Sequence, residues 1–283
     1  MFVSSGTQSN LTALLSHCQR GEEYLVGSTY HCYRYEAGGA AVLGSIQPQP
    51  LDVLPDGSVA LESITAAIKP EDPHFARSRV LCLENTTDGR ALTVEYLRAA
   101  AAVARDRGLG VHLDGARLFN AAIALGVDPA VIAEPADTVS ICLSKGLGAP
   151  VGSVLSGSPE LIASARRWRK MLGGGMRQAG VLAAAGCFAL AHHVERLAVD
   201  HDRATALAEG LAATGRFTLA HDPGGRTNMV FALLADPTQA ETLNRRFAEQ
   251  GILVLGGPSY RFVTHLDLTD DDIVAVLATA SAA

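Results

Sequence analysis

A lysine near the middle of the chain stands where an apolar run gives way to glycines. Residues 140–152, S-I-C-L-S-K-G-L-G-A-P-V-G, start like a buried strand and continue with the glycines and proline of a loop. Lys145 therefore lies just past the end of a predicted strand. In proteins generally, burial lowers the pKa of an amine, and a lowered pKa is what a nucleophilic amine needs. Taken alone, this segment still favours a surface lysine over a catalytic one.

Two further charges follow another apolar run. Asp114 and Arg117 stand in H-L-D-G-A-R, directly after a predicted buried strand at residues 109–113. The strand before Lys145 should end at the same edge of the sheet, which is where open α/β sheets bind ligands. Three charges from two strand ends could then meet in one crevice. Asp114 could equally be a helix N-cap, with Arg117 as its ion-pair partner at the surface.

The rest of the chain predicts the elements that position these residues. Strands separated by helices imply right-handed crossovers and a mainly parallel sheet. We therefore expect an α/β fold with helices on both faces of the sheet, a large domain at 1–195 and a small α+β domain at 196–283. The predicted strands lie at residues 2–3, 22–27, 47–53, 79–83, 109–113, 138–143, 153–156, 216–220, 229–233, 252–255 and 261–264. The predicted helices lie at 6–18, 30–43, 61–68, 94–107, from 116, from 129, 159–171, 181–191, about 194–212 (linking the two domains), 237–250 and 270–280.

Composition limits the classes of partner. The 283 residues are 48% hydrophobic and 18% charged, which is typical of a globular protein. A net charge of -6 without a basic stripe argues against nucleic acid, and no apolar run reaches membrane-spanning length. The five cysteines form no C-x-x-C pair, and the histidines show no metal-ligand spacing. We expect a soluble cytoplasmic protein without a metal site.

Other polar residues allow two interpretations each. Gly6 and Thr7 open a helix whose free backbone N–H groups suit a phosphate, although N-capping by Ser5 or Thr7 explains them locally. His31 lies among tyrosines, and His74 lies in the polar loop P-E-D-P-H-F. By composition alone, His31 fits aromatic packing and His74 fits an ordinary loop.

Five segments, in order along the chain, resemble the low-specificity L-threonine aldolase family of fold type I pyridoxal-phosphate enzymes. Together they are far more specific than one short motif. They are Y-R-Y-E-A-G-G-A-A-V-L-G, H-L-D-G-A-R-L-F-N-A, S-I-C-L-S-K-G-L-G-A-P-V-G-S, K-M-L-G-G-G-M-R-Q-A-G and R-F-V-T-H.

The resemblance implies a site for pyridoxal 5'-phosphate. Lys145 would form a Schiff base with the cofactor, and Asp114 would pair with the pyridine nitrogen so that the ring accepts electrons. Arg117 would reach the 3-oxygen of the cofactor, and His31 would stack on its ring. The phosphate would lie at a helix N-terminus and against an arginine of a neighbouring subunit. The residues implied for it are Gly6, Thr7, Gln8 and Arg177.

The resemblance also implies a reaction. Arg261 would grip the carboxylate of the substrate, with Arg117 nearby, while His31 and His74 would be candidate bases at the β-hydroxyl. The expected activity is retro-aldol cleavage of L-threonine, L-allo-threonine and related β-hydroxy-α-amino acids to glycine and an aldehyde. Shared active sites would make the protein a homodimer or a homotetramer.

Two departures from the family pattern leave alternatives open. Family members carry an R-S-D-T-type segment ahead of the residues that begin this sequence, and Thr87 stands where relatives often have histidine. One alternative is another fold type I reaction: a racemase, a β-eliminating lyase or a serine hydroxymethyltransferase-like enzyme. The other is a truncated homologue that binds the cofactor but is weakly active or non-catalytic.

Overall fold

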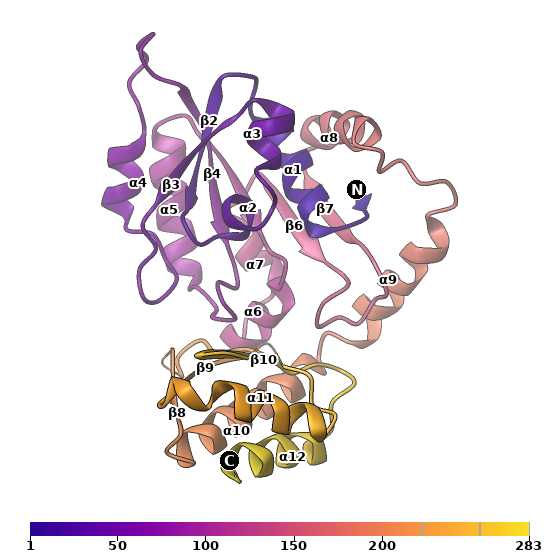
Figure 1. Cartoon of the computed structure of the whole chain (residues 1–283). Coiled ribbons are helices and arrows are strands. Elements are labelled where there is room, and N and C mark those ends of the chain that lie inside the picture. The colour runs from indigo at the N-terminus through magenta and orange to yellow at the C-terminus, as the bar shows by residue number, and fades with distance from the viewer. Residues whose placement is uncertain (222, 255, 283) are drawn as a thin grey trace.

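Seven strands form the main sheet, in the order β1-β7-β6-β5-β4-β2-β3 (Figure 1). The structure is a computed structural model and describes residues 1–221, 223–254 and 256–282. Strands β2 to β6 run parallel, whereas β7 is antiparallel to both β6 and β1. The prediction of a mainly parallel sheet is confirmed. The strands are β1 (Phe2–Val3), β2 (Glu22–Gly27), β3 (Gln47–Leu51), β4 (Arg77–Glu84), β5 (Gly110–Asp114), β6 (Thr138–Cys142) and β7 (Ser153–Gly157).

Helices cover this sheet. All six residues of β2 are buried, which requires cover on both of its faces. Helix α1 packs on β5, β6 and β7, and α5 packs on β4 and β5. The helices are α1 (Gly6–His17), α2 (His31–Arg34), α3 (Gly39–Gly44), α4 (Leu61–Ala67), α5 (Val94–Asp106), α6 (Leu118–Leu125), α7 (Pro129–Ala133), α8 (Pro159–Met171) and α9 (Gly180–His192).

A smaller antiparallel sheet follows, in the order β10-β9-β8, and lies below the main sheet in Figure 1. Its apolar core is separate and is built around Phe217, Phe247 and Tyr260. The boundary predicted near residue 195 stays a prediction. The elements are α10 (Leu197–Ala213), β8 (Phe217–Leu219), β9 (Met229–Leu234), the 3-10 turn η1 (Pro237–Gln239), α11 (Ala240–Glu249), β10 (Ser259–Val263) and α12 (Asp270–Ser281).

Two predicted elements differ from the structure. The single helix expected at 30–43 is divided into α2 and α3, because Ala37 (φ 53°) and Gly38 (φ 66°) adopt the left-handed conformation. This break leaves Glu36 in a turn, where it is buried. The strand expected at 252–255 is absent over residues 252–254, and Leu255 lies outside the described residues.

Candidate active site

The carboxyl ends of three parallel strands meet at one edge of the main sheet. Glu84 of β4 pairs with Asp114 of β5, and Asp114 pairs with Ser140 of β6. Lys145 follows the end of β6 by three residues. The expected convergence of the strand ends that precede Asp114 and Lys145 is therefore confirmed. The sequence alone did not single out Glu84, although it ends a strand in the same way.

The side-chain amine of half-buried Lys145 has no hydrogen bond or ion pair among the described residues. Its positive charge nevertheless reaches groups on two strands. Burial raises the pKa of Glu84 well above its ordinary range and Asp114 adds to this rise, while Lys145 opposes it. Burial likewise raises the pKa of the Cys142 thiol, and Lys145 again opposes the rise. An unpaired amine in this position can bind an electrophilic ligand.

Asp114 is fixed from two sides. One carboxylate oxygen accepts a hydrogen bond from Asn10 Nδ2 at 2.8 Å, and the other accepts the backbone N–H of Ala116 at 3.0 Å. Helix α6 begins at Leu118 with Arg117 as its N-cap residue, so Asp114 does not cap it. Among the described residues, Asp114 and Arg117 form no ion pair. Asp114 is thus a buried, oriented carboxylate.

Arg117 offers an unused hydrogen-bond donor. Within the described chain, its buried Nε has no hydrogen-bond partner. Burial lowers the pKa of Arg117, and the positive charge of Arg261 lowers it further. Two arginines that repel each other, one of them with an orphaned donor, are suited to an anion placed between them. These residues fit a ligand with a carboxylate or phosphate group.

The N-terminus of α1 lies next to the same edge. A Cβ built on Gly6 would lie 2.9 Å from Cys142 Sγ, so the start of α1 packs against the end of β6. Ser5 caps the helix by accepting the N–H of Gln8 at 3.2 Å. Within the first turn, the N–H groups of Gly6 and Thr7 have no helical acceptor and suit a phosphate. The amide oxygen of Gln8 accepts from the backbone N–H and hydroxyl of Ser4, so it is already engaged.

His31 is held by two carboxylates. Its backbone N–H donates to Glu84 Oε2 at 2.6 Å, and its Nδ1 lies 2.9 Å from Glu36 Oε1. The His31 side chain is 41% exposed, whereas that of Glu36 is 5% exposed. The hydrogen bond to Glu36 raises the pKa of His31. Nδ1 therefore carries a proton toward Glu36, and Nε2 is left to face a ligand.

His31, Glu36 and Asp114 also form a compact cluster. Their ligand-type atoms lie within 4.8 Å of one another, a spacing that a metal ion could use. However, the amide nitrogen of Asn10 donates to both carboxylates at 2.8 Å. The two carboxylates therefore share one neutral hydrogen-bond donor.

Within its own chain, His74 lies away from this edge of the sheet. It precedes β4, so it lies at the amino-terminal edge of the sheet, whereas Glu84 ends the same strand. The eight residues of β4 separate the two edges by about 25 Å. The His74 side chain is 84% exposed and contacts Asp72 at 2.6 Å. Its predicted roles as catalytic base and substrate ligand stay a prediction.

The surroundings of His74 are a separate feature. Its neighbours Asp72, Pro73 and Phe75 line a cavity of about 800 Å³ together with residues at the starts of β2 and β4. None of the residues predicted for the active site lines this cavity.

Arg177 and Thr87 stand apart from the cluster. Arg177 is exposed and forms no hydrogen bond or ion pair within the described part of the chain. Its predicted phosphate contact, in a neighbouring subunit, stays a prediction. Thr87 is buried, and its hydroxyl donates to the backbone carbonyl of Glu84 at 3.2 Å. It therefore supports the loop that follows β4.

Sequence reasoning missed Asn10, Glu36 and Glu84. Glu84 could have been found by the same reasoning as Asp114, because it too ends an apolar strand at the carboxyl edge of the sheet. Asn10 lies one turn after the predicted phosphate residues, and Glu36 precedes a glycine pair. Neither position in the sequence reveals that Asn10 joins Glu36 to Asp114, since these hydrogen bonds arise only from tertiary packing.

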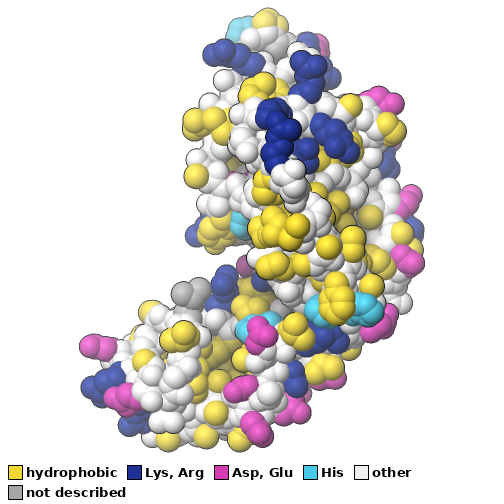
Figure 2. All heavy atoms as spheres, turned by 90° about the vertical axis from the view of Figure 1, so that its right-hand side faces the viewer, with side chains coloured by type: hydrophobic (Ala, Val, Ile, Leu, Met, Phe, Trp, Pro, Cys, Tyr) yellow, Lys and Arg dark blue, Asp and Glu magenta, His cyan; other side chains and the backbone are white. Residues whose placement is uncertain are grey.

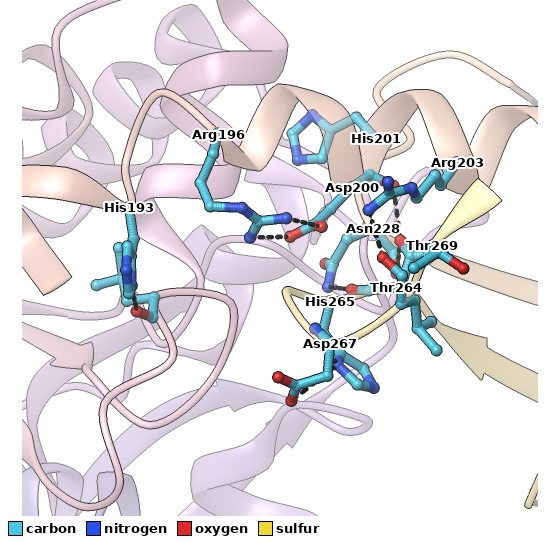
Figure 3. A network of polar contacts seen from close by, with 12 residues as sticks. His193, Arg196, Asp200, His201, Arg203, Asn228, Thr264, His265, Asp267 and Thr269 are labelled. Carbon is cyan, nitrogen blue, oxygen red and sulfur yellow. Dashed lines mark hydrogen bonds and ion pairs between the residues drawn. The ribbon is translucent and has the colours of Figure 1, made fainter. Parts of the chain in front are cut away.

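The smaller sheet is tied to the active-site edge by a polar network (Figure 3). His193, which follows α9, bonds through Nδ1 to the carbonyl of Leu147, two residues after Lys145. Arg196, the N-cap residue of α10, pairs with buried Asp200. The carbonyl of Asp200 accepts the hydroxyl of Thr264, which follows the strand that carries Arg261. The network holds both the lysine loop and the arginine strand against the start of α10.

Solved structures share this architecture. The Leishmania major threonine aldolase structure matches with a TM-score of 0.86 at 23% identity, covering 99% of this chain and 83% of that one. A serine palmitoyltransferase from Sphingomonas wittichii matches with a TM-score of 0.76 at 18% identity, covering 100% and 71%. Identities this low show the fold alone. The fold is that of the fold type I pyridoxal-phosphate enzymes, which confirms the predicted fold class.

Sequence comparison narrows this class. The family model described as beta-eliminating lyase matches residues 1–236. A low specificity L-threonine aldolase from Escherichia coli strain K12 is 49% identical over 278 residues, which cover 98% of this chain and 82% of that protein. The chain belongs to the low-specificity L-threonine aldolase family, and the resemblance in the five sequence segments is confirmed.

Proposed function

We propose that this protein uses pyridoxal phosphate to cleave L-threonine, L-allo-threonine and related β-hydroxy-α-amino acids into glycine and an aldehyde. Lys145 carries the proposal, because it is an unpaired, half-buried amine beside an oriented buried carboxylate, Asp114. The bound cofactor supplies a ring that accepts the electrons released when the bond between Cα and Cβ breaks. Family membership supports this substrate class.

The residues at the strand ends would hold the cofactor. Lys145 would hold it through its amine, and Asp114 would face the pyridine nitrogen. The first-turn N–H groups of Gly6 and Thr7 would hold the phosphate, because they have no helical acceptors. The packing of Gly6 against Cys142 brings this phosphate site close to the strand that leads to Lys145.

Arg117 and Arg261 would hold the substrate carboxylate. Arg117 has the unused Nε–H, and the charge of Arg261 lowers the Arg117 pKa after the larger effect of burial. An anion between them removes this repulsion and satisfies the orphaned donor. Because β10 carries Arg261, the smaller sheet takes part in the site.

His31 would exchange the proton of the substrate hydroxyl. Glu36 holds the Nδ1–H of His31, so that Nε2 of the neutral ring is a free acceptor. The removed proton would reside on Nε2, and the positive ring would be stabilised by Glu36. Within one chain, His31 is the predicted histidine that lies at this edge, and it is the base that we propose.

We further propose that the protein is a homo-oligomer with shared sites. Helix α9 and the segment before it expose an apolar surface, and Figure 2 shows hydrophobic side chains gathered on this face beneath a group of Lys and Arg. Exposed Arg177 lies at the start of this surface and would reach a neighbouring phosphate. The large exposed apolar residues are Met171, Met176, Val181, Phe188 and Leu190.

A cytoplasmic location also belongs to the proposal. All five cysteines are free, and four of them are buried, which suits a reducing compartment. Among the described residues, no helix is long and apolar enough to span a membrane.

Product analysis tests the proposed reaction. The purified protein with pyridoxal phosphate is incubated separately with L-threonine, L-allo-threonine and L-serine, and glycine, aldehyde and ammonia are quantified. We expect equal amounts of glycine and acetaldehyde from the first two substrates, without ammonia. Ammonia as the main product would identify a β-eliminating enzyme, and loss of optical activity from L-serine without cleavage would identify a racemase.

A further inference from the structure

Four polar residues line the space between α1 and the main sheet. Asn10 and His17 are seven residues apart on α1, which places them two turns apart on one face. His112 precedes Asp114 by two residues on β5, so both side chains point to the same face of the sheet. Thr138 of β6 is the register partner of His112. The periodicity of side chains along the helix and along the strand therefore brings these four residues together.

They form a continuous chain of hydrogen bonds. The Asn10 side-chain nitrogen lies 2.8 Å from both Asp114 Oδ2 and Glu36 Oε1. Asn10 Oδ1 lies 3.1 Å from His112 Nε2, and His112 Nδ1 lies 2.9 Å from Thr138 Oγ1. The chain ends with His17 Nε2, at 2.8 Å from the same hydroxyl. Asn10, His112 and Thr138 are each at most 1% exposed.

Chemistry assigns the direction of each bond. Carboxylates only accept, so the two amide hydrogens of Asn10 point to the carboxylates and its oxygen accepts from His112 Nε2–H. A neutral His112 then accepts at Nδ1 from the hydroxyl of Thr138, whose oxygen accepts from His17. Burial lowers the pKa of His112 to about 4, which agrees with a neutral ring at neutral pH.

We propose that Asn10 and His112 are positioning residues for the active site. His112 fixes the orientation of the Asn10 amide, and the nitrogen of that amide holds Asp114 and Glu36 together. Glu36 in turn holds His31. The carboxylate for the pyridine nitrogen and the base for the substrate hydroxyl are therefore coupled through a single amide. This inference rests on the proposed function, in which Asp114 and His31 face the cofactor and the substrate.

The coupling depends on the donor at His112 Nε2. Without it, Asn10 can rotate and turn its oxygen toward two carboxylates, which would repel it. A buried carboxylate that loses a donor binds a proton more readily, so Asp114 would pair less well with the ring nitrogen. His112→Phe removes the donor, whereas His112→Gln retains an N–H near the Nε2 position.

The test measures cofactor binding in the holoenzyme. Pyridoxal phosphate is titrated into wild type, His112→Phe and His112→Gln, and the absorbance of the bound cofactor is followed against pH. Loss of the donor should raise the cofactor dissociation constant about tenfold in His112→Phe and move the acid limb of the absorbance to higher pH. His112→Gln should restore most of both properties.

A control separates positioning from loss of stability. Leu14→Ala removes a buried side chain from the same helix outside the chain of hydrogen bonds. It should lower the melting temperature without the change in the pH profile. His112→Phe with a wild-type profile, or His112→Gln with the same defect as His112→Phe, would overturn the inference. A wild type that binds no pyridoxal phosphate would instead contradict the proposed function.

A second measurement does not depend on the cofactor. Nitrogen-15 spectra of the histidine rings should show His112 as a neutral ring protonated at Nε2 throughout the pH range in which the protein is folded. A ring protonated at Nδ1, or a charged one, would also overturn the inference.

Discussion

The two edges of the main sheet both carry charged residues, but they use them differently. At the amino-terminal edge, Lys69 pairs with fully buried Glu23, and Arg79 pairs with Glu22. At the carboxyl edge, Lys145 has no such partner within the described residues, and the Nε of Arg117 is orphaned. The amino-terminal edge also has the cavity of about 800 Å³. Cavity volume therefore does not identify this active site. The unpaired amine of Lys145 and the unpaired Nε–H of Arg117 identify it.

Removing each edge's lysine should have opposite effects on activity and stability. Lys145→Ala should lower kcat/KM for L-threonine by at least about 10⁴-fold, because it removes the group that holds the cofactor. The melting temperature of the cofactor-free protein should be unchanged or higher, since no ion pair is lost. Steady-state kinetics and thermal unfolding measure the two effects. Activity within tenfold of wild type would show that Lys145 is not the cofactor lysine.

Lys69→Met should show the reverse pattern. Buried Glu23 would lose its ion-pair partner, so the free energy of unfolding should fall by about 2 to 3 kcal/mol. The folded protein should retain its kcat/KM, because Lys69 lies at the other edge. Urea unfolding monitored by circular dichroism measures the loss, with exposed Lys170→Met as the control. A large loss of activity in the folded variant would contradict the claim that the amino-terminal edge serves stability and not catalysis.

The pH dependence should reflect the pairing of His31 with Glu36. The hydrogen bond to Glu36 raises the pKa of His31 above 6.5, and the base must be neutral. kcat/KM should therefore fall as the pH decreases through a midpoint above 6.5. Glu36→Gln removes the negative charge that stabilises the positive ring, so this midpoint should move to lower pH. A midpoint that stays or rises in Glu36→Gln would contradict this role for the pair.

The smallest effect is expected at His74. If His74 acts only within its own chain, His74→Ala should change kcat/KM by less than about twofold, because the side chain is exposed and far from the Lys145 of that chain. His31→Ala, measured in parallel, should show a clear loss. Equal losses in both variants would place His74 at the site of reaction after all.

The sequence predicted the carboxyl edge because its signals are local. An apolar strand followed by a charge marks both Asp114 and Lys145, and parallel pairing puts their ends together. The same rule places His74, which precedes a strand, at the opposite edge of its own chain; its assignment followed the family resemblance alone. Strand β7 reverses direction because about ten residues separate it from β6, too few for a helical crossover.

Asn10 and Glu36 could not be found in this way. Their importance arises from one amide on α1 that bridges two carboxylates, one on β5 and one in the turn after α2. That turn exists because Ala37 and Gly38 interrupt what the sequence pattern presents as one helix. Contacts between distant segments leave no mark in local periodicity.

The central claim is that Lys145, the unpaired lysine, holds the cofactor. The sequence makes this claim easy to test, because its only lysines are Lys69, Lys145 and Lys170. The holoenzyme would be reduced with borohydride and digested, and the peptides searched by mass spectrometry for the phosphopyridoxyl group. We predict the label on Lys145, with Lys69 and Lys170 unlabelled. Labelling of Lys69 or Lys170 in place of Lys145, or of no lysine, would contradict the account.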